Sequence, residues 1–331
     1  MNNSKVAVIG GGSWATAIVK ILSENKVVTH WWLRNQKDIE HIRKFHHNPS
    51  YLSSVNIDAD IIRPTEDLEL AVRESDIIFL VVPSAFVAEV LLHLDTQILK
   101  GKIVVSAIKG MIPEENILVT DYIQKRFGVL EKDIAVIAGP CHAEEVAMEK
   151  QSYLSVASEA RETAIRIEKM LQCRFINVHT IQDVVGVEYS AVIKNIIAIA
   201  CGVAHGLNYG DNFQAVLVSN AMQEISRFVQ AIYPKERDLN ASAYLGDLLV
   251  TTYSQFSRNR TFGNMIGRGY SVKSAQMEMD MVAEGYYALK SIFEINKKYK
   301  VNIPIITAVY NVIYERITPI IEFKILQEKL N

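Results

Sequence analysis

The stretch "VIGGGSWATAI", residues 8–18, decides how the first half of the chain folds. It completes the β-rich run "KVAVIG" and opens a helical stretch, with Gly10, Gly12 and Ala15 in a G-x-G-x-x-G/A pattern. In this pattern the first glycine allows a tight turn, the second lets the backbone approach a pyrophosphate, and the third residue lets helix and strand pack closely. The amides at the helix start can then receive an anion. The stretch predicts a dinucleotide-binding loop, with an ordinary glycine-rich turn as the alternative.

The end of the next β-rich run, "WWLRN", indicates which dinucleotide is accepted. An NAD-selective site usually carries Asp or Glu at this point, about twenty residues after the loop, where the carboxylate binds the ribose 2′-hydroxyl. This chain has Arg34 and Asn35 instead. A carboxylate would repel a 2′-phosphate, whereas Arg34 can accept one or stack on adenine. We therefore expect NADP(H) to be tolerated alongside NAD(H), unless Arg34 is a solvated surface arginine.

Short β-rich runs alternate with helical stretches through the first half of the chain, and this alternation predicts a parallel sheet covered on both faces. After about residue 182 strand-like runs disappear and long apolar-periodic segments follow, which predicts helices. The expected fold is α/β plus all-α: a Rossmann-type doubly wound parallel sheet over residues 1–182, then a helical substrate-binding and catalytic domain over residues 183–331. The expected strands are "KVAVIG", "VVTHWWLR", "DIIFLVV", "KIVVSAI", "DIAVIAG", "YLSVAS" and "RFINVHT", and the expected helices lie in residues 186–206, 212–233, 242–255, 274–299 and 304–317.

Composition narrows the class of protein. The chain has 331 residues, 49% of them hydrophobic, which suits two domains that each bury a core. A formal net charge of −2 gives no sign of a nucleic-acid or anionic-membrane partner. We see neither a secretory signal pattern nor an apolar run near the ~20 residues of a membrane span. The three cysteines are too far apart for a disulfide framework or a zinc site. We expect a cytoplasmic protein without membrane insertion or a metal site.

Lys194 stands in the middle of "GVEYSAVIKNIIAIACG", residues 186–202, a helical stretch that is otherwise almost wholly apolar. Helix positions three, four and seven apart share a face, and around Lys194 that face carries mostly small side chains. The lysine could extend to the surface with its stem covering apolar area. However, the helix is apolar on most sides, and an unpaired buried charge costs several kcal/mol. Such a cost is tolerated more readily where the group has a task, so the pattern favours a functional lysine.

Reduction of a ketone by hydride leaves negative charge on the carbonyl oxygen, which a neighbouring cation stabilises and then protonates. In the reverse direction a neutral amine must remove the alcohol proton, and both desolvation and a second cation lower a lysine pKa. Lys109 follows the strand "KIVVSAI", where ligands of such sheets bind, so it is a candidate for that second cation. A plain surface lysine is the alternative.

Two further groups complete the candidate site. Asp247 and Thr251 are four residues apart, so they share one face if "GDLLVTT" is helical. Asp247 could orient Lys194 and balance its charge, or cap the helix. Ser257, Arg258 and Asn259 in "QFSRNR" fall in a helix-terminal or loop segment, where a guanidinium suits a phosphate dianion. A solvated polar loop is the alternative for this segment.

Taken together, these stretches resemble the family of bacterial NAD(P)-dependent glycerol-3-phosphate dehydrogenases, which interconvert glycerol 3-phosphate and dihydroxyacetone phosphate. The matches also include "VVPS", "SAIKG", "AGPCHAEEV", "GDNFQAVLVSNAMQEI" and "VAEGYYALK", and they occur in family order from the first strand to about residue 290. The family has a Rossmann domain followed by a helical domain. This chain departs from it at Ala15 (usually Gly), at Cys141 (often Ser or Thr), at Tyr244 (commonly the first Gly of Gly-Leu-Gly-Asp) and at "YLSS" near Tyr51 (usually "YLP").

The resemblance implies an oxidoreductase that uses NAD(H) and/or NADP(H), with Lys194 as proton acceptor and donor. It also implies a role in supplying glycerol 3-phosphate for phospholipid synthesis. The expected partner is the small-molecule substrate, not nucleic acid, and the expectation leaves room for a homodimer. The implied catalytic residues are Lys194, Lys109, Asp247 and Thr251. The implied substrate-binding residues are Lys109, Gly139, Cys141, Lys194, Asp247, Ser257, Arg258 and Asn259. The implied cofactor-binding residues are Gly10, Gly12, Ser13, Trp14, Arg34, Lys109, Ala143, Arg258, Val282 and Glu284.

Two other functions compete with this one. A related dehydrogenase could act on a hydroxy acid, with Arg258 holding a carboxylate. A non-catalytic nicotinamide sensor or scaffold could retain the same fold, but it would be expected to lose the residues for proton transfer and anion binding. Lys194, Lys109, Asp247 and Arg258 are all present, which argues against the sensor.

Overall fold

The chain forms two compact units in a computed structural model that describes residues 4–279 and 283–331. The first, here called the sheet unit, runs to Ile108 and resumes over Val119–Val184. The second, the helical unit, consists of Lys109–Leu118 and Val185–Asn331. The sequence predicts one boundary between residues 182 and 183, whereas the chain passes between the units three times.

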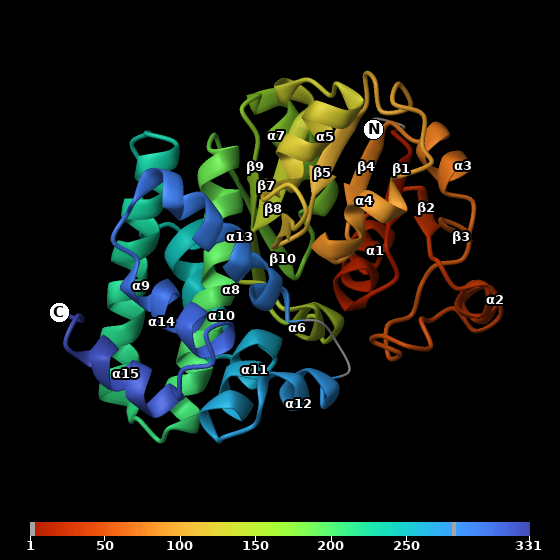
Figure 1. The fold of residues 1–331 in the computed structure, drawn as a ribbon. Helices are drawn as coiled ribbons and strands as arrows, with labels where there is room; N and C mark the ends of the chain where they lie inside the picture. Colours follow the sequence, from red (N-terminus) through yellow and green to blue (C-terminus); the bar gives the residue numbers. More distant parts are fainter. Residues whose placement is uncertain (1–3, 280–282) are drawn as a thin grey trace. The chain divides into compact units, whose positions relative to one another are not determined.

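The sheet unit is built on eight strands in the order β10-β9-β8-β5-β4-β1-β2-β3 (Figure 1). Neighbouring strands pair in parallel except β8 and β9, which are antiparallel. The predicted parallel sheet is thus confirmed for its larger part, and the last two strands run against the rest. The strands are β1 (Val6–Ile9), β2 (Thr29–Trp32), β3 (Ile62–Thr65), β4 (Ile77–Leu80), β5 (Ile103–Ser106), β8 (Ile134–Ala138), β9 (Ser152–Ala157) and β10 (Ile176–Ile181).

Both faces of this sheet are covered. Every residue of β1, β2, β4, β5 and β8 is buried, as expected for strands with helices on both sides. Helices α1 and α3 both pack on β1 and β2, α2 packs on β3, and α7 packs on β9 and β10. The helices of this unit are α1 (Ser13–Glu24), α2 (Gln36–Phe45), α3 (Leu68–Arg73), α4 (Val87–Val90), α5 (Val119–Phe127), α6 (Ala143–Ala147) and α7 (Arg161–Leu171).

The strand order reverses at β1, which lies between β2 and β4. Ligands of such sheets bind beyond the carboxyl ends of the strands at this switch point. Gly10 follows β1 here with φ of 136°, a conformation that favours glycine. A Cβ on Gly10 would lie 2.4 Å from the Val81 carbonyl oxygen, beyond the end of β4. The loop after β1 therefore lies directly against the backbone after β4, and only glycine fits.

Helix α8 (Val184–Gly206) returns the chain to the helical unit. It is long and apolar enough to span a membrane, but 94% of its most apolar window is buried inside the protein. It is a core helix. The predicted segment 242–255 is a π-helical turn, Ser242–Gly246, followed by α10, and the segment 274–299 is two helices. The other elements are the hairpin β6 (Met111–Ile112) and β7 (Ile117–Leu118), then α9 (Asp211–Ile232), α10 (Asp247–Tyr253), α11 (Arg258–Gly267), α12 (Val272–Met277), α13 (Glu284–Tyr299), α14 (Pro304–Ile313) and α15 (Pro319–Gln327) (Figure 1).

Helices α8 and α11 cross with their backbones in contact. Gly202 and Gly206 lie one turn apart on α8, and Gly263 and Gly267 lie one turn apart on α11. A Cβ on Gly263 would come within 2.1 Å of the Ile199 carbonyl oxygen, and a Cβ on each of the other three glycines would lie 2.1–2.5 Å from a carbonyl oxygen of the opposite helix. Without side chains between them the two helices cannot slide freely. The crossing therefore fixes the start of α11 relative to the middle of α8.

Candidate active site

Lys194 projects from α8 into the interior of the helical unit and does not reach the surface. It is 3% exposed. Its Nζ donates to Oδ1 of Asp247 and to Oγ1 of Thr251, the latter at 3.0 Å. Asp247 is itself 1% exposed, so the ammonium group and its carboxylate are buried as a pair. The alternative, in which this lysine extends to the surface, is therefore wrong.

Asp247 and Thr251 meet Lys194 because they lie one turn apart on α10, as the four-residue spacing predicted. The N-cap position of α10 belongs to Gly246, and Asp247 is the first helical residue. Its side chain contacts Lys194, which favours the orienting role over the capping role. The Thr251 hydroxyl donates to the Asp247 carbonyl oxygen at 2.7 Å, so its lone pair is directed to the lysine.

Lys109 brings a second ammonium group to the same carboxylate. Its Nζ lies 3.6 Å from Asp247 Oδ1, and its side chain is 22% exposed. Its carbonyl oxygen accepts a hydrogen bond from Nδ2 of Asn195 at 2.8 Å. Asn195 follows Lys194 on α8, so one helix turn positions both lysines. Asn195 was not predicted; its only signal was that it is a polar residue beside the lysine in an apolar helix.

The electrostatic result is one carboxylate between two cations. Burial lowers the pKa of Lys194, Asp247 opposes this shift, and the nearby Lys109 cation adds to it. The pKa of Lys194 therefore falls well below its usual value near 10.5. A lysine in this state exchanges its proton more readily at neutral pH than a surface lysine does.

The Ser257–Arg258–Asn259 group forms the start of α11. Ser257 is the N-cap, and its Oγ accepts a hydrogen bond from the amide of Arg260 at 3.3 Å. Asn259 is buried, and its Oδ1 accepts from the amide of Gly285 at 2.9 Å. Arg258 is exposed. Two of the three predicted substrate residues thus have structural hydrogen bonds, and they hold the arginine at a helix N-terminus, where an anion is favoured.

The glycine loop fits a dinucleotide. Gly12 takes the N-cap position of α1, and no atom lies within 4 Å of where its Cβ would be. The space in front of the helix start is therefore open, and the first turn carries Ser13 and Trp14 but no acidic residue. Arg34 follows β2 and is exposed, while Asn35 caps α2 by accepting from the Lys37 amide at 3.0 Å.

The remaining predicted residues are distributed over both units. Gly139 follows β8 with φ of 110°, and a Cβ on it would come within 2.8 Å of the Tyr153 carbonyl oxygen. Cys141 and Ala143 are buried after it, and Ala143 begins α6. Of the residues expected to bind cofactor, Lys109, Arg258 and Glu284 belong to the helical unit, with Glu284 at the start of α13. Val282 lies outside the described residues.

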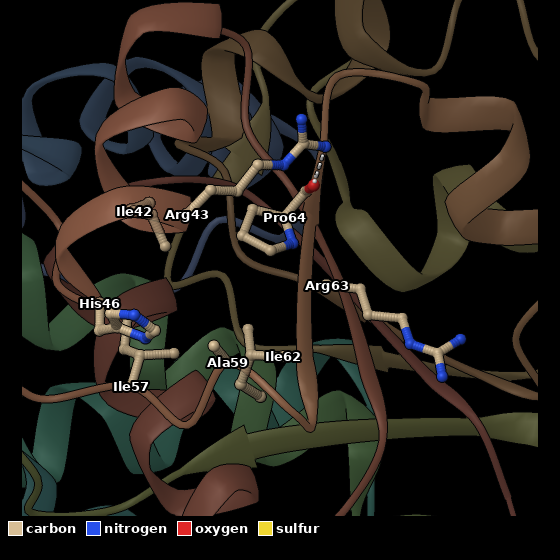
Figure 2. Close-up of a pocket in the computed structure, with 8 residues that line it drawn as sticks. All are labelled: Ile42, Arg43, His46, Ile57, Ala59, Ile62, Arg63 and Pro64. Atoms are coloured by element: carbon tan, nitrogen blue, oxygen red, sulfur yellow. Dashed lines mark hydrogen bonds between the residues drawn. The ribbon is translucent and has the colours of Figure 1, made fainter.

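A hollow between α2 and the edge strand β3 does not belong to this site (Figure 2). Ile42, Ile57 and Ile62 line it, and the Arg43 guanidinium donates to the Pro64 carbonyl oxygen at 2.7 Å. That arginine holds the edge strand to the helix.

Hydride transfer needs a site for the dinucleotide and a group that exchanges a proton with the substrate. The glycine loop of the sheet unit and the buried Lys194 of the helical unit have the chemistry that these two tasks require. The molecule is therefore of the class of nicotinamide-dependent dehydrogenases. The family models for the N-terminus and the C-terminus of NAD-dependent glycerol-3-phosphate dehydrogenase match residues 5–164 and 183–323. The chain belongs to this family.

Known relatives agree with this assignment over nearly the whole length. The chain is 35% identical over 328 residues to glycerol-3-phosphate dehydrogenase [NAD(P)+] of Clostridium botulinum, covering 98% of each chain. It is 33% identical over 311 residues to the enzyme of that name from Bacillus subtilis, covering 94% of this chain and 90% of the relative. A crystal structure of glycerol-3-phosphate dehydrogenase from Coxiella burnetii superposes with a TM-score of 0.90 at 27% identity, covering 98% and 99% of the two chains.

Proposed function

We propose that this chain interconverts sn-glycerol 3-phosphate and dihydroxyacetone phosphate with NAD(H) or NADP(H). The observation that carries the proposal is the buried group of Lys194, Asp247 and Thr251 in a chain of this family. A bound nicotinamide cofactor would donate hydride to the ketone or accept it from the alcohol. The protein's own residues handle the proton and hold the substrate.

Lys194 is the proposed proton donor and acceptor. In the reducing direction its ammonium group protonates the substrate oxygen as hydride arrives at C2, which yields the alcohol and a neutral amine. In the oxidising direction the neutral amine takes the hydroxyl proton. Asp247 and Thr251 keep the lysine in one orientation, and Lys109 is the second cation that stabilises negative charge on the substrate oxygen.

Arg258 is the proposed phosphate-binding residue. A guanidinium binds phosphate through charge-assisted bonds, and the partial positive charge of the α11 N-terminus adds to the attraction. The crossing of α8 and α11 then sets the distance between a bound phosphate and Lys194. A hydroxy acid held by its carboxylate is the competing substrate class.

The sheet unit is the proposed cofactor-binding part. The amides of Gly11, Gly12 and Ser13 would bind the pyrophosphate of the cofactor, and Arg34 would accept the 2′-phosphate of NADP(H) without excluding NAD(H). On the family resemblance we also place the reaction in the cytoplasm, where it supplies glycerol 3-phosphate for phospholipid synthesis. A homodimer is the assembly that we propose to test. Light scattering of the purified protein tests the dimer.

The test is turnover of the purified chain. Dihydroxyacetone phosphate should be reduced with NADH and with NADPH, and glycerol 3-phosphate should be oxidised with NAD(P)+. A panel of 2-keto acids without phosphate should be reduced far more slowly. Faster reduction of a keto acid than of dihydroxyacetone phosphate would replace the proposal with the hydroxy-acid alternative. Cofactor binding without turnover of any of these substrates would support the sensor.

A further inference from the structure

Three buried side chains donate hydrogen bonds to the backbone of the glycine loop, and each binds a different carbonyl oxygen of the loop. The indole Nε1 of Trp31 donates to the Gly10 oxygen at 2.7 Å. Nδ2 of Asn48 donates to the Gly11 oxygen at 3.0 Å. The hydroxyl of Thr16 donates to the Gly12 oxygen at 3.0 Å, beside the helical bond that the Thr16 amide makes to the same oxygen at 2.9 Å. Three consecutive carbonyl groups of the loop are thereby bound.

Asn48 is the centre of this arrangement. Its second Nδ2 bond goes to Oγ1 of Thr16 at 2.8 Å, which links two of the three side chains. Its Oδ1 accepts from the amides of Ser50 at 2.9 Å and Tyr51 at 3.2 Å, so the segment between α2 and β3 turns around it. The side-chain amide thus makes two donor and two acceptor bonds, which is its full capacity. It is 1% exposed, and a buried polar network with every bond made is rigid.

The orientation of the loop amides follows from peptide geometry. All peptide bonds between described residues are trans, and in a trans peptide the C=O and the next N–H point in opposite directions. Binding the Gly10, Gly11 and Gly12 oxygens therefore directs the N–H groups of Gly11, Gly12 and Ser13 to the other side of the loop. Trp31, Asn48 and Thr16 are fully or almost fully buried, whereas those three loop residues are only half-buried. The amides therefore point away from the three buried side chains, on the side where the loop is only half-buried.

We propose that Trp31, Asn48 and Thr16 are positioning residues that preset these three amides for the cofactor pyrophosphate. This inference rests on the proposed function, because it assumes that the loop binds NAD(P)H. A flexible glycine loop would have to be ordered on binding, and that entropy would weaken the affinity. With the carbonyl groups bound in advance, the amides form an anion site before the cofactor arrives. The three side chains act through the loop backbone.

The experiment measures the dissociation constant of NADPH by fluorescence titration, without turnover. Asn48→Asp keeps the acceptor bonds to the Ser50 and Tyr51 amides but loses both donor bonds. It should weaken NADPH binding by about tenfold or more, since each lost bond is worth about 2-fold to 12-fold. Thr16→Val and Trp31→Phe should each weaken it about 5-fold, and Thr16→Ser, which keeps the hydroxyl, should restore it. KM for NADPH should rise in step, with kcat and KM for dihydroxyacetone phosphate little changed.

Thr163→Val is the matched control. Thr163 is a buried threonine of α7 in the same unit, and its hydroxyl donates to the Lys132 carbonyl oxygen at 2.7 Å. This variant should lose thermal stability as Thr16→Val does but keep wild-type affinity for NADPH. Equal weakening by both Thr→Val variants, or wild-type affinity in Asn48→Asp, would overturn the inference. Failure of the wild-type chain to bind NADPH would instead overturn the proposed function on which it rests.

Discussion

Lys194 should give the two directions of the reaction opposite pH dependences. Burial and Lys109 put its pKa below 10.5, and only the neutral amine can accept a proton. Oxidation of glycerol 3-phosphate should therefore speed up as pH rises through this lowered pKa, while reduction should slow down over the same range. Lys194→Met should abolish the pH dependence of both directions and cut kcat by roughly 10²- to 10⁴-fold. The measurement is kcat against pH in each direction.

Substitutions of Lys109 and Asp247 test whether Lys194 is the group that titrates, because these two side chains shift its pKa in opposite directions. Lys109→Met removes a cation that lowers the pKa of Lys194, so the pH range over which kcat changes should move to higher pH. Asp247→Asn removes the carboxylate that raises the pKa of Lys194, so the pH range over which kcat changes should move to lower pH. Shifts in the same direction for both variants would show that another group titrates.

Arg258 should matter only for a substrate that carries a phosphate. A charge-assisted bond is worth about 1.5–3 kcal/mol, so Arg258→Ala should lower kcat/KM for dihydroxyacetone phosphate by roughly 10- to 100-fold. Unphosphorylated dihydroxyacetone, which we expect to be a poor substrate, should be little affected. Arg268→Ala is the matched control, because Arg268 is the C-cap at the opposite end of α11. Equal losses with the two ketones would mean that the phosphate is bound elsewhere.

The close crossing of α8 and α11 predicts that a side chain placed between the two helices will destabilise the protein. In Gly263→Ala the new Cβ would lie 2.1 Å from the Ile199 carbonyl oxygen, and neither helix backbone can give way locally. The free energy of unfolding should fall by about 1–3 kcal/mol, as for other overpacked sites. KM for dihydroxyacetone phosphate should rise as well, because α11 carries Arg258. Denaturant unfolding and steady-state kinetics measure the two effects.

Gly210→Ser is the control for that substitution. Gly210 is the N-cap of α9, and no atom lies within 4 Å of its Cβ position. Serine is favoured at an N-cap, so this variant should be as stable as the wild type or more so. Wild-type stability in Gly263→Ala would show that the two helices separate easily, and the proposed rigid spacing would be wrong.

The elements that sequence reasoning found are those whose signal is local. The strand before Gly10 and the helix around Lys194 have patterns that a short window reveals, and both are where they were predicted. Strand β3 was missed because it is four residues long and contains Pro64, which an edge strand tolerates because its outer side pairs with no other strand in the described part of the chain. Asn48 and Asn195 were missed for another reason. Their hydrogen bonds join segments that are distant in sequence, and the residues around each asparagine do not indicate which segment it will contact.

For the molecule as a whole, the hairpin of residues 109–118 is the feature that a division after residue 182 overlooks. Met111, Ile112 and Leu118 are each 1% exposed, and Met111 and Leu118 belong to the apolar core of the helical unit. Strand β6 packs on α13. Three buried apolar side chains contribute on the order of 5 kcal/mol, which is comparable with the whole stability of many domains.

A fragment of residues 183–331 should therefore unfold at a much lower temperature than the helical unit of the whole chain, or without cooperativity. The same fragment with residues 109–118 joined to its N-terminus by a flexible Gly/Ser linker should regain a cooperative transition, because Met111 and Leu118 can return to their places in the core. A control fusion with Met111, Ile112 and Leu118 replaced by serine should not regain it. Circular dichroism during heating compares the three fragments. If all three melted alike, the hairpin would contribute nothing to the helical core, and only its Lys109 would tie it functionally to that unit.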